Sequence, residues 1–187
     1  MTKTVLSLKI TLHGSKPPIW RRLLVPGTMN LHDLHNAILA TMGWHGGHMH
    51  AFDVGGQQYG DANDMDDVKE ETRLTLNAIV KSGVKQFVYT YDFGDDWEHR
   101  IVIEKSAPAV PGQPYPACVA GRRNGPPDDC GGIWGYADLL EILADPNHPE
   151  REERLEWIGV DDFDPEEFSV EDADTALAGC FARKPLA

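Results

Sequence analysis

Histidines and carboxylates in the first half of the chain recur at spacings that suit a metal ion. His48 and His50 are one residue apart in a segment, residues 48–54, whose pattern predicts a strand. Alternate residues of a strand face the same side of a sheet, so both imidazoles could reach one ion. Asp92, Asp96 and His99 would complete the ligand set. These five residues are therefore candidate ligands of a divalent transition metal, Zn²⁺ or Mn²⁺, which would activate a water molecule for hydrolysis.

The same residues also have an interpretation that needs no metal. If that strand face packs into the core, His50 and His99 are hydrogen-bonded core histidines, and Asp92 and Asp96 are turn formers. The chain contains no His-Glu-x-x-His motif that would favour the metal. Both interpretations stay open on the sequence alone.

A further set of side chains could bind an anion, a peptide or single-stranded nucleic acid. Tryptophans beside arginines or histidines offer stacking and cationic contacts, although single aromatic residues more often belong to the core. Two neighbouring arginines could grip a carboxylate or a phosphate, and an Asp-Asp-Cys sequence lies in a segment rich in glycine and proline. The candidate binding residues are Trp20, Arg21, Arg22, Trp44, Arg122, Arg123, Asp128, Asp129 and Cys130.

Apolar periodicity predicts the elements that must position these residues. Residues 31–42 have helical spacing, with Asn30 as N-cap and Gly43 at the C-terminal end. Residues 61–72 read as an acidic loop. Strands are predicted over residues 4–12, 19–25, 48–54, 57–59, 86–92 and 97–104, and further helices over residues 75–83, 136–144, 149–158 and about 170–182.

This order of elements predicts one α+β domain over residues 1–187, a mostly antiparallel sheet with helices on one face. Its start, two strands and then a helix, is like that of a β-grasp fold. The part over residues 1–105 is rich in strands, residues 106–135 form a connection rich in proline and glycine, and residues 136–187 form an acidic helical part. The metal site requires the strand over residues 48–54 to lie in the same sheet as the hairpin over residues 86–104.

Charge and composition narrow the classes of partner. The net charge is −13, and residues 138–174 hold fifteen Asp and Glu against Arg151 and Arg154. DNA binding needs clustered basic residues, so a nucleic-acid partner is disfavoured. No run approaches the 18 apolar residues of a membrane span, which argues against a membrane partner. Three cysteines are too few for a disulfide framework, which favours a cytoplasmic location.

Three long motifs of the chain resemble one known family. The segments PPIWRRLLVPGTMNLHDLHNAILATMGWHGGHMHAF, YTYDFGDDWEHRIVIE and GPPDDCGGIWGYADLLEIL are similar to the plasmid Ri open-reading-frame-three-like family. The resemblance implies an α+β bacterial domain of unknown biochemical role, in a family whose members are often labelled insertion-element passenger, resolvase (TnpR)-like proteins. Gly125 stands where the family usually has a cysteine, which argues against a thiol pair here. No nucleophilic serine among arginines supports the resolvase label.

The sequence leaves three functions open. The first is a non-catalytic cytoplasmic interaction or accessory module, associated with plasmids or mobile elements, whose acidic helical part contacts a protein partner. The second is a metal-dependent hydrolase or nuclease that uses the His and Asp candidates. The third is a DNA-binding protein of a mobile element that uses Arg21, Arg22, Arg122 and Arg123.

Overall fold

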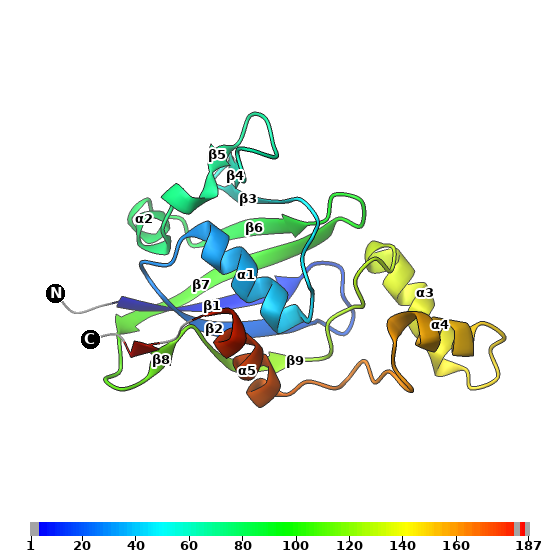
Figure 1. Cartoon of the computed structure of the whole chain (residues 1–187). Helices are drawn as coiled ribbons and strands as arrows, with labels where there is room; N and C mark the ends of the chain where they lie inside the picture. The colour runs from blue at the N-terminus through cyan, green and yellow to red at the C-terminus, as the bar shows by residue number, and fades with distance from the viewer. Residues whose placement is uncertain (1–3, 182–183, 186–187) are drawn as a thin grey trace.

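A single eight-stranded sheet forms the body of the protein. The computed structural model describes residues 4–181 and 184–185. Figure 1 shows the sheet, whose strand order is β5-β4-β3-β6-β7-β1-β2-β9; all neighbours are antiparallel except β4 and β5. The strands are β1 (Thr4–Leu12), β2 (Trp20–Pro26), β3 (His50–Val54), β4 (Gln57–Gly60), β5 (Lys69–Glu70), β6 (Gln86–Tyr91), β7 (Trp97–Pro108) and β9 (Ala117–Arg122), while β8 (Pro114–Tyr115) and β10 (Lys184–Pro185) pair separately.

Helices cover one face of this sheet and also extend beyond it. They are α1 (Leu31–Met42), α2 (Leu76–Lys81), α3 (Gly132–Ala144), α4 (Arg151–Ile158) and α5 (Val170–Cys180), together with a 3₁₀ turn, η1 (Glu71–Arg73). Figure 1 shows α1 and α5 in front of the sheet, whereas α3 and α4 stand to one side. The predicted α+β class is therefore confirmed. Within the described ranges, no helix combines the length and apolarity that a bilayer crossing requires.

Alternation along β1 accounts for the core between the sheet and α1. Leu6, Leu8, Ile10 and Leu12 are almost fully buried, as the period of two predicts. The apolar stripe of α1 packs against the same core. The predicted caps are also present, because the Asn30 side chain accepts a hydrogen bond from the Asp33 amide and Gly43 adopts a left-handed φ of 83°.

The Pro/Gly-rich connection differs most from its prediction. It contains β9, which pairs with β2 at the edge of the sheet and packs against α5. Small residues and glycine weaken the strand pattern of β9, so propensity alone misses a strand that depends on pairing.

Two helices begin at other residues than predicted. α3 begins at Gly132 rather than at residue 136. α4 begins at Arg151 rather than at Pro149, because Glu150 occupies its N-cap.

Candidate functional site

The two histidines of the His-x-His motif separate in the structure. β3 begins at His50, so His48 lies in the segment before the strand, and Gly46 and Gly47 turn that segment with positive φ angles. The argument from strand alternation therefore does not apply to His48. β3 itself lies in the same sheet as the β6–β7 hairpin, as the predicted metal site requires, because β3 pairs with β6 and β6 pairs with β7.

His48 meets carboxylates from two distant segments. Its Nε2 atom is 3.2 Å from Asp129 Oδ1, and its Nδ1 atom is 3.6 Å from Asp92 Oδ2. Asp92 follows β6, and Asp128 and Asp129 precede α3. His48, Asp128 and Asp129 each offer one ligand atom, and these three atoms lie within 4.8 Å of one another. We call His48, Asp92, Asp128 and Asp129 the His48 cluster.

One buried oxygen atom of this cluster and one beside it lack well-formed hydrogen bonds to the described residues. Asp128 Oδ1 is buried and accepts no hydrogen bond from any described residue. Burial, followed by the charge of Asp129, raises the pKa of Asp128. Tyr91 is fully buried; its hydroxyl lies near the His48 backbone but forms no well-formed hydrogen bond within the described ranges. Burial and then the cluster carboxylates raise the pKa of Tyr91. A cation bound to the Asp128 carboxylate would compensate for the burial of its charge.

Close contact with the β6–β7 hairpin fixes the loop that carries Asp128 and Asp129. The Gly131 amide donates to Asp95 Oδ2 at 3.0 Å. A Cβ atom on Gly132 would lie 2.2 Å from the Asp95 carbonyl oxygen, so only glycine fits there. Asp92 and Asp129 themselves adopt left-handed φ angles of 54° and 59°. Aspartate adopts this conformation more readily than most residues, and Asp92 Oδ1 accepts a hydrogen bond from the Gly94 amide at 2.9 Å, as in an Asx turn.

His50 belongs to a second, separate cluster around a buried carboxylate. Its Nε2 atom is 2.8 Å from Glu71 Oε2, and His32 Nδ1 is 2.9 Å from Glu71 Oε1. His35 stacks on His50 at 3.5 Å between ring centroids and lies 2.6 Å from the Tyr89 hydroxyl. Burial, then the charge of His50, lowers the pKa of His35 to about 3, so its ring is neutral. We call these five residues the Glu71 cluster.

Glu71 was not predicted from the sequence. It is only 1% exposed although it lies in the segment predicted as an acidic loop. Its partners are 21 and 39 residues away along the chain, so no local spacing signals the contact. A hollow of about 260 Å³ adjoins both clusters, because His48, His50 and Glu71 all line it.

His99 and Asp96 lie outside the His48 cluster. His99 is fully buried, its Nδ1 atom is 2.9 Å from the Trp97 carbonyl oxygen, and burial lowers its pKa to about 4. It is the neutral core histidine of the alternative interpretation. Asp96 is an exposed turn residue with a φ of 54°. Of the five candidate metal ligands, the structure thus brings together His48 and Asp92, and adds Asp128 and Asp129 from the binding candidates.

Two of the remaining binding candidates, Arg21 and Trp44, are buried and donate hydrogen bonds to backbone carbonyl oxygens. Arg21 is buried, donates from Nε to the Thr41 carbonyl oxygen at 2.7 Å, and stacks on Phe168. Burial lowers its pKa to about 10. Trp44 is also buried and donates from Nε1 to the Pro126 carbonyl oxygen at 2.9 Å. Neither side chain forms part of an exposed surface for nucleic acid.

The other candidates have protein partners as well. Arg22 forms an ion pair with Glu104 at 2.7 Å and lies over Trp20. Arg122 and Arg123 approach Glu166, at 3.9 and 2.8 Å. Burial raises the pKa of Cys130 to about 12, which keeps a thiol rather than a metal-binding thiolate beside the His48 cluster.

Comparisons with known proteins agree with one another. Residues 4–172 match the family described as plasmid pRiA4b ORF-3-like protein. A protein of Sinorhizobium fredii, described as uncharacterized protein y4hQ, is 39% identical over 98% of this chain and 97% of its own length. The crystal structure of MM3350 from Methanosarcina mazei, a protein of unknown function, is similar with a TM-score of 0.84 and 39% identity, over 92% of this chain and 98% of its own.

Proposed function

The chain belongs to the plasmid pRiA4b ORF-3-like protein family, and from that premise and the geometry of the His48 cluster we propose that it binds a divalent metal ion and catalyses a hydrolysis. One observation supports this most strongly: ligand atoms of His48, Asp128 and Asp129 lie within 4.8 Å of one another, and Asp128 Oδ1 is buried without a hydrogen-bond partner among the described residues. Buried charged groups without partners are costly, so such an arrangement favours a bound cation.

The donor atoms favour Mn²⁺ over Zn²⁺. The cluster offers one imidazole and otherwise carboxylate oxygens. Carboxylates suit Mg²⁺, Ca²⁺ and Mn²⁺, whereas Zn²⁺ sites usually contain more nitrogen or sulfur. His48, Asp128 and Asp129 would hold the ion, and Asp92, 3.6 Å from His48 Nδ1, would orient the imidazole from the other side.

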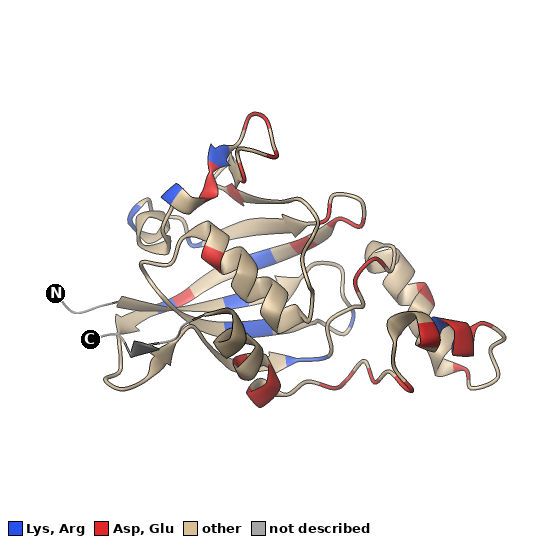
Figure 2. Cartoon of the chain, in the orientation of Figure 1, with Lys and Arg blue, Asp and Glu red and all other residues tan. Residues whose placement is uncertain are grey.

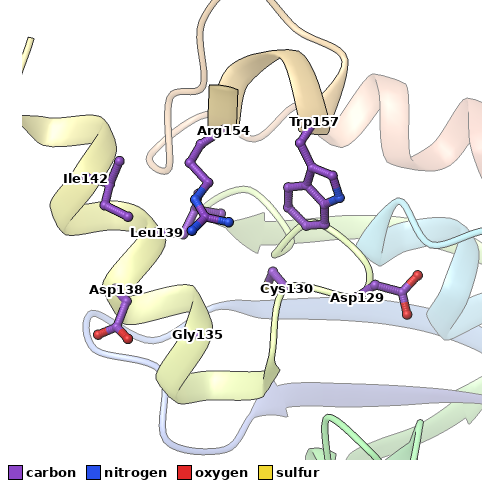
Figure 3. A pocket seen from close by; sticks show the side chains of 8 residues that line it. All are labelled: Asp129, Cys130, Gly135, Asp138, Leu139, Ile142, Arg154 and Trp157. Carbon is purple, nitrogen blue, oxygen red and sulfur yellow. The ribbon is translucent and has the colours of Figure 1, made fainter. Parts of the chain in front are cut away.

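A hollow of about 330 Å³ beside Asp129 supports an anionic ester as substrate. Figure 3 shows Arg154 of α4 over Leu139, and Trp157 of the same helix pointing toward the segment that carries Cys130 and Asp129. An arginine can bind a phosphoryl group, and an indole can stack on an aromatic group of the same substrate. A metal ion supplies a water of lowered pKa for such a reaction. We therefore propose a phosphoester as the substrate class.

The test measures metal binding and hydrolysis in the same preparations. Protein purified without a histidine tag should take up one Mn²⁺ in a calorimetric titration and hydrolyse p-nitrophenyl phosphate or bis-p-nitrophenyl phosphate when Mn²⁺ is added. Asp128→Asn should weaken metal binding at least about tenfold and abolish turnover. Asp138→Asn, which alters the same hollow but no proposed ligand, should bind the metal normally. Absence of metal uptake by the wild type would refute the metal site, and uptake without turnover of either ester would refute the hydrolysis.

A second proposal concerns a protein partner. Figure 2 shows acidic residues on α4 and along the segment that follows it, apart from the sheet. This concentration of negative charge supports an accessory role in which α3 and α4 contact a basic partner. A cytoplasmic location belongs to the same proposal, supported by the free thiols of Cys118, Cys130 and Cys180, and an association with plasmids is supported by the family's description.

An oligolysine peptide tests this second proposal. It should quench the fluorescence of Trp157, which is 48% exposed on α4. The quenching should weaken with added salt and in a variant that carries Glu152→Gln, Glu153→Gln and Glu156→Gln. Unchanged quenching in that variant would show that α4 does not form the surface.

A further inference from the structure

A third hollow, of about 380 Å³, lies between the turn after β1 and α3. Apolar side chains of α3 form one wall of it, namely Ile133, Ala137 and Leu140. Gly14 and Ser15 of the turn, together with basic and aromatic residues, form the rest. We call this hollow the Tyr136 pocket. Neither the His48 cluster nor the Glu71 cluster contributes a residue to it, so its function is independent of the proposed hydrolysis.

A buried arginine supplies positive charge to this pocket. Arg123 is 4% exposed, donates from an Nη atom to the Pro17 carbonyl oxygen at 3.1 Å, and approaches Glu166 at 2.8 Å. Glu166 is about half exposed, so water screens its charge. Lys16 adds a second cation at the pocket. The remaining guanidinium hydrogens suit the planar fork of a carboxylate.

The Tyr136 hydroxyl is a polar group of this pocket that no described residue satisfies. Tyr136 is 3% exposed, and its buried hydroxyl has no hydrogen-bond partner within the described ranges. Burial raises its pKa to about 12, while the charge of Arg123 opposes this shift, so the hydroxyl remains a donor. A buried donor without an acceptor is energetically unfavourable. An oxygen atom of a ligand beside Arg123 would satisfy it.

An exposed indole stands at the same pocket. Trp134 is 82% exposed on α3, although tryptophan is usually among the more buried residues. Its ring offers a flat apolar surface beside Ile133 and Leu140. An exposed indole of this kind can pack against the aromatic ring of a ligand.

We propose that the Tyr136 pocket binds a small organic carboxylate with an aromatic body. The carboxylate accepts hydrogen bonds from the Tyr136 hydroxyl and the Arg123 guanidinium, and Lys16 adds attraction. The aromatic body packs between Trp134 and the apolar wall of α3. Arg123 lies against Glu166 and Lys16 is exposed to water, so the positive charge left for a ligand suits the single charge of a carboxylate better than the double charge of a phosphate monoester.

Binding of benzoate and phenylacetate tests this proposal, measured by ligand-observed NMR and by tryptophan fluorescence. Both probes should bind saturably, and benzyl alcohol, which lacks the charge, should bind at least about tenfold more weakly. Phenyl phosphate should bind more weakly than benzoate. Absence of saturable binding of the carboxylates, equal binding of benzyl alcohol, or tighter binding of phenyl phosphate would overturn the proposed ligand class.

Single substitutions separate ligand binding from folding. Tyr136→Phe removes a hydroxyl that has no partner among the described residues, so it should weaken benzoate binding about tenfold while thermal stability stays equal or rises. Trp134→Ala should weaken binding without affecting the fold, because the side chain is exposed. Arg122→Gln, which alters an exposed neighbour outside the pocket, is the control and should bind normally. Unchanged affinity in Tyr136→Phe would show that the hydroxyl does not contact the ligand.

Discussion

The carboxylates of Glu71 and Asp128 differ in whether a neighbouring side chain forms a hydrogen bond with each buried oxygen. Two imidazoles satisfy the buried carboxylate of Glu71, whereas an oxygen of Asp128 has no partner among the described residues. The first arrangement holds β3, α1 and η1 together and is complete as it stands. The second is incomplete, which is the physical basis for assigning the metal to the His48 cluster rather than to the Glu71 cluster.

Replacement of Glu71 should destabilise the fold. Glu71→Gln keeps the shape of the side chain but removes the negative charge that His32 and His50 contact, so we expect a loss of about 1–3 kcal/mol in the free energy of unfolding. Urea denaturation followed by circular dichroism measures it. Asp64→Asn, an exposed change at the same hollow, is the control and should have no effect. Equal midpoints for Glu71→Gln and the wild type would contradict the structural role.

The buried neutral histidines predict a loss of stability in acid. The folded-state pKa values of His99, about 4, and His35, about 3, lie below the unfolded value near 6.5. As the pH falls below 6.5, the unfolded chain binds protons that the folded chain does not, so stability present above pH 6.5 is lost toward pH 4. Each such histidine contributes a slope of about 1.4 kcal/mol per pH unit.

His99→Gln isolates one of these contributions. In denaturant titrations at several pH values, the variant should lose stability less steeply than the wild type between pH 6.5 and 4. Parallel curves for the two proteins would show that His99 takes up its proton equally in both states.

Among the helices and strands, hydrophobic periodicity predicts those whose formation depends on residues close in sequence. It misses those that form only because a distant segment packs or pairs beside them. The stripe of α1, its Asn30 cap and the alternation of β1 follow from local rules, and all three were predicted correctly. β9 and η1 were missed, because a weak edge strand needs β2 beside it and η1 is held by His32 and His50. The His48 cluster was predicted in part for the same reason: its residue types were recognised, but the loop that delivers Asp128 and Asp129 depends on a tertiary contact.

That tertiary contact predicts a specific sensitivity at Gly132. Gly132→Ala places a methyl group against the Asp95 carbonyl oxygen, so the loop must move away from the hairpin and carry Asp128 and Asp129 with it. Mn²⁺ affinity measured by calorimetry should fall about tenfold or more while the circular dichroism spectrum is retained.

Gly179 in α5 provides the matched control. A Cβ atom there meets nothing within 4 Å, so Gly179→Ala should bind Mn²⁺ normally and gain up to about 1 kcal/mol in stability. Normal Mn²⁺ binding by Gly132→Ala would show that the loop contact does not position the site.

At the scale of the whole molecule, the distribution of charge argues against binding to DNA. The net charge is −13, Arg21 is buried, and Arg22 and Arg123 lie against glutamates. We therefore expect no binding of duplex DNA in gel-shift assays even at low ionic strength. A salt-sensitive shift that Arg122→Gln weakens would instead support the DNA-binding alternative.

The proposed function depends most on the ion between His48, Asp128 and Asp129. The most direct measurement is anomalous diffraction from crystals grown with Mn²⁺. We expect an anomalous peak about 2 Å from a nitrogen of His48 and from oxygens of Asp128 and Asp129. Crystals saturated with Mn²⁺ that show no peak there, or a peak only at other residues, would contradict it.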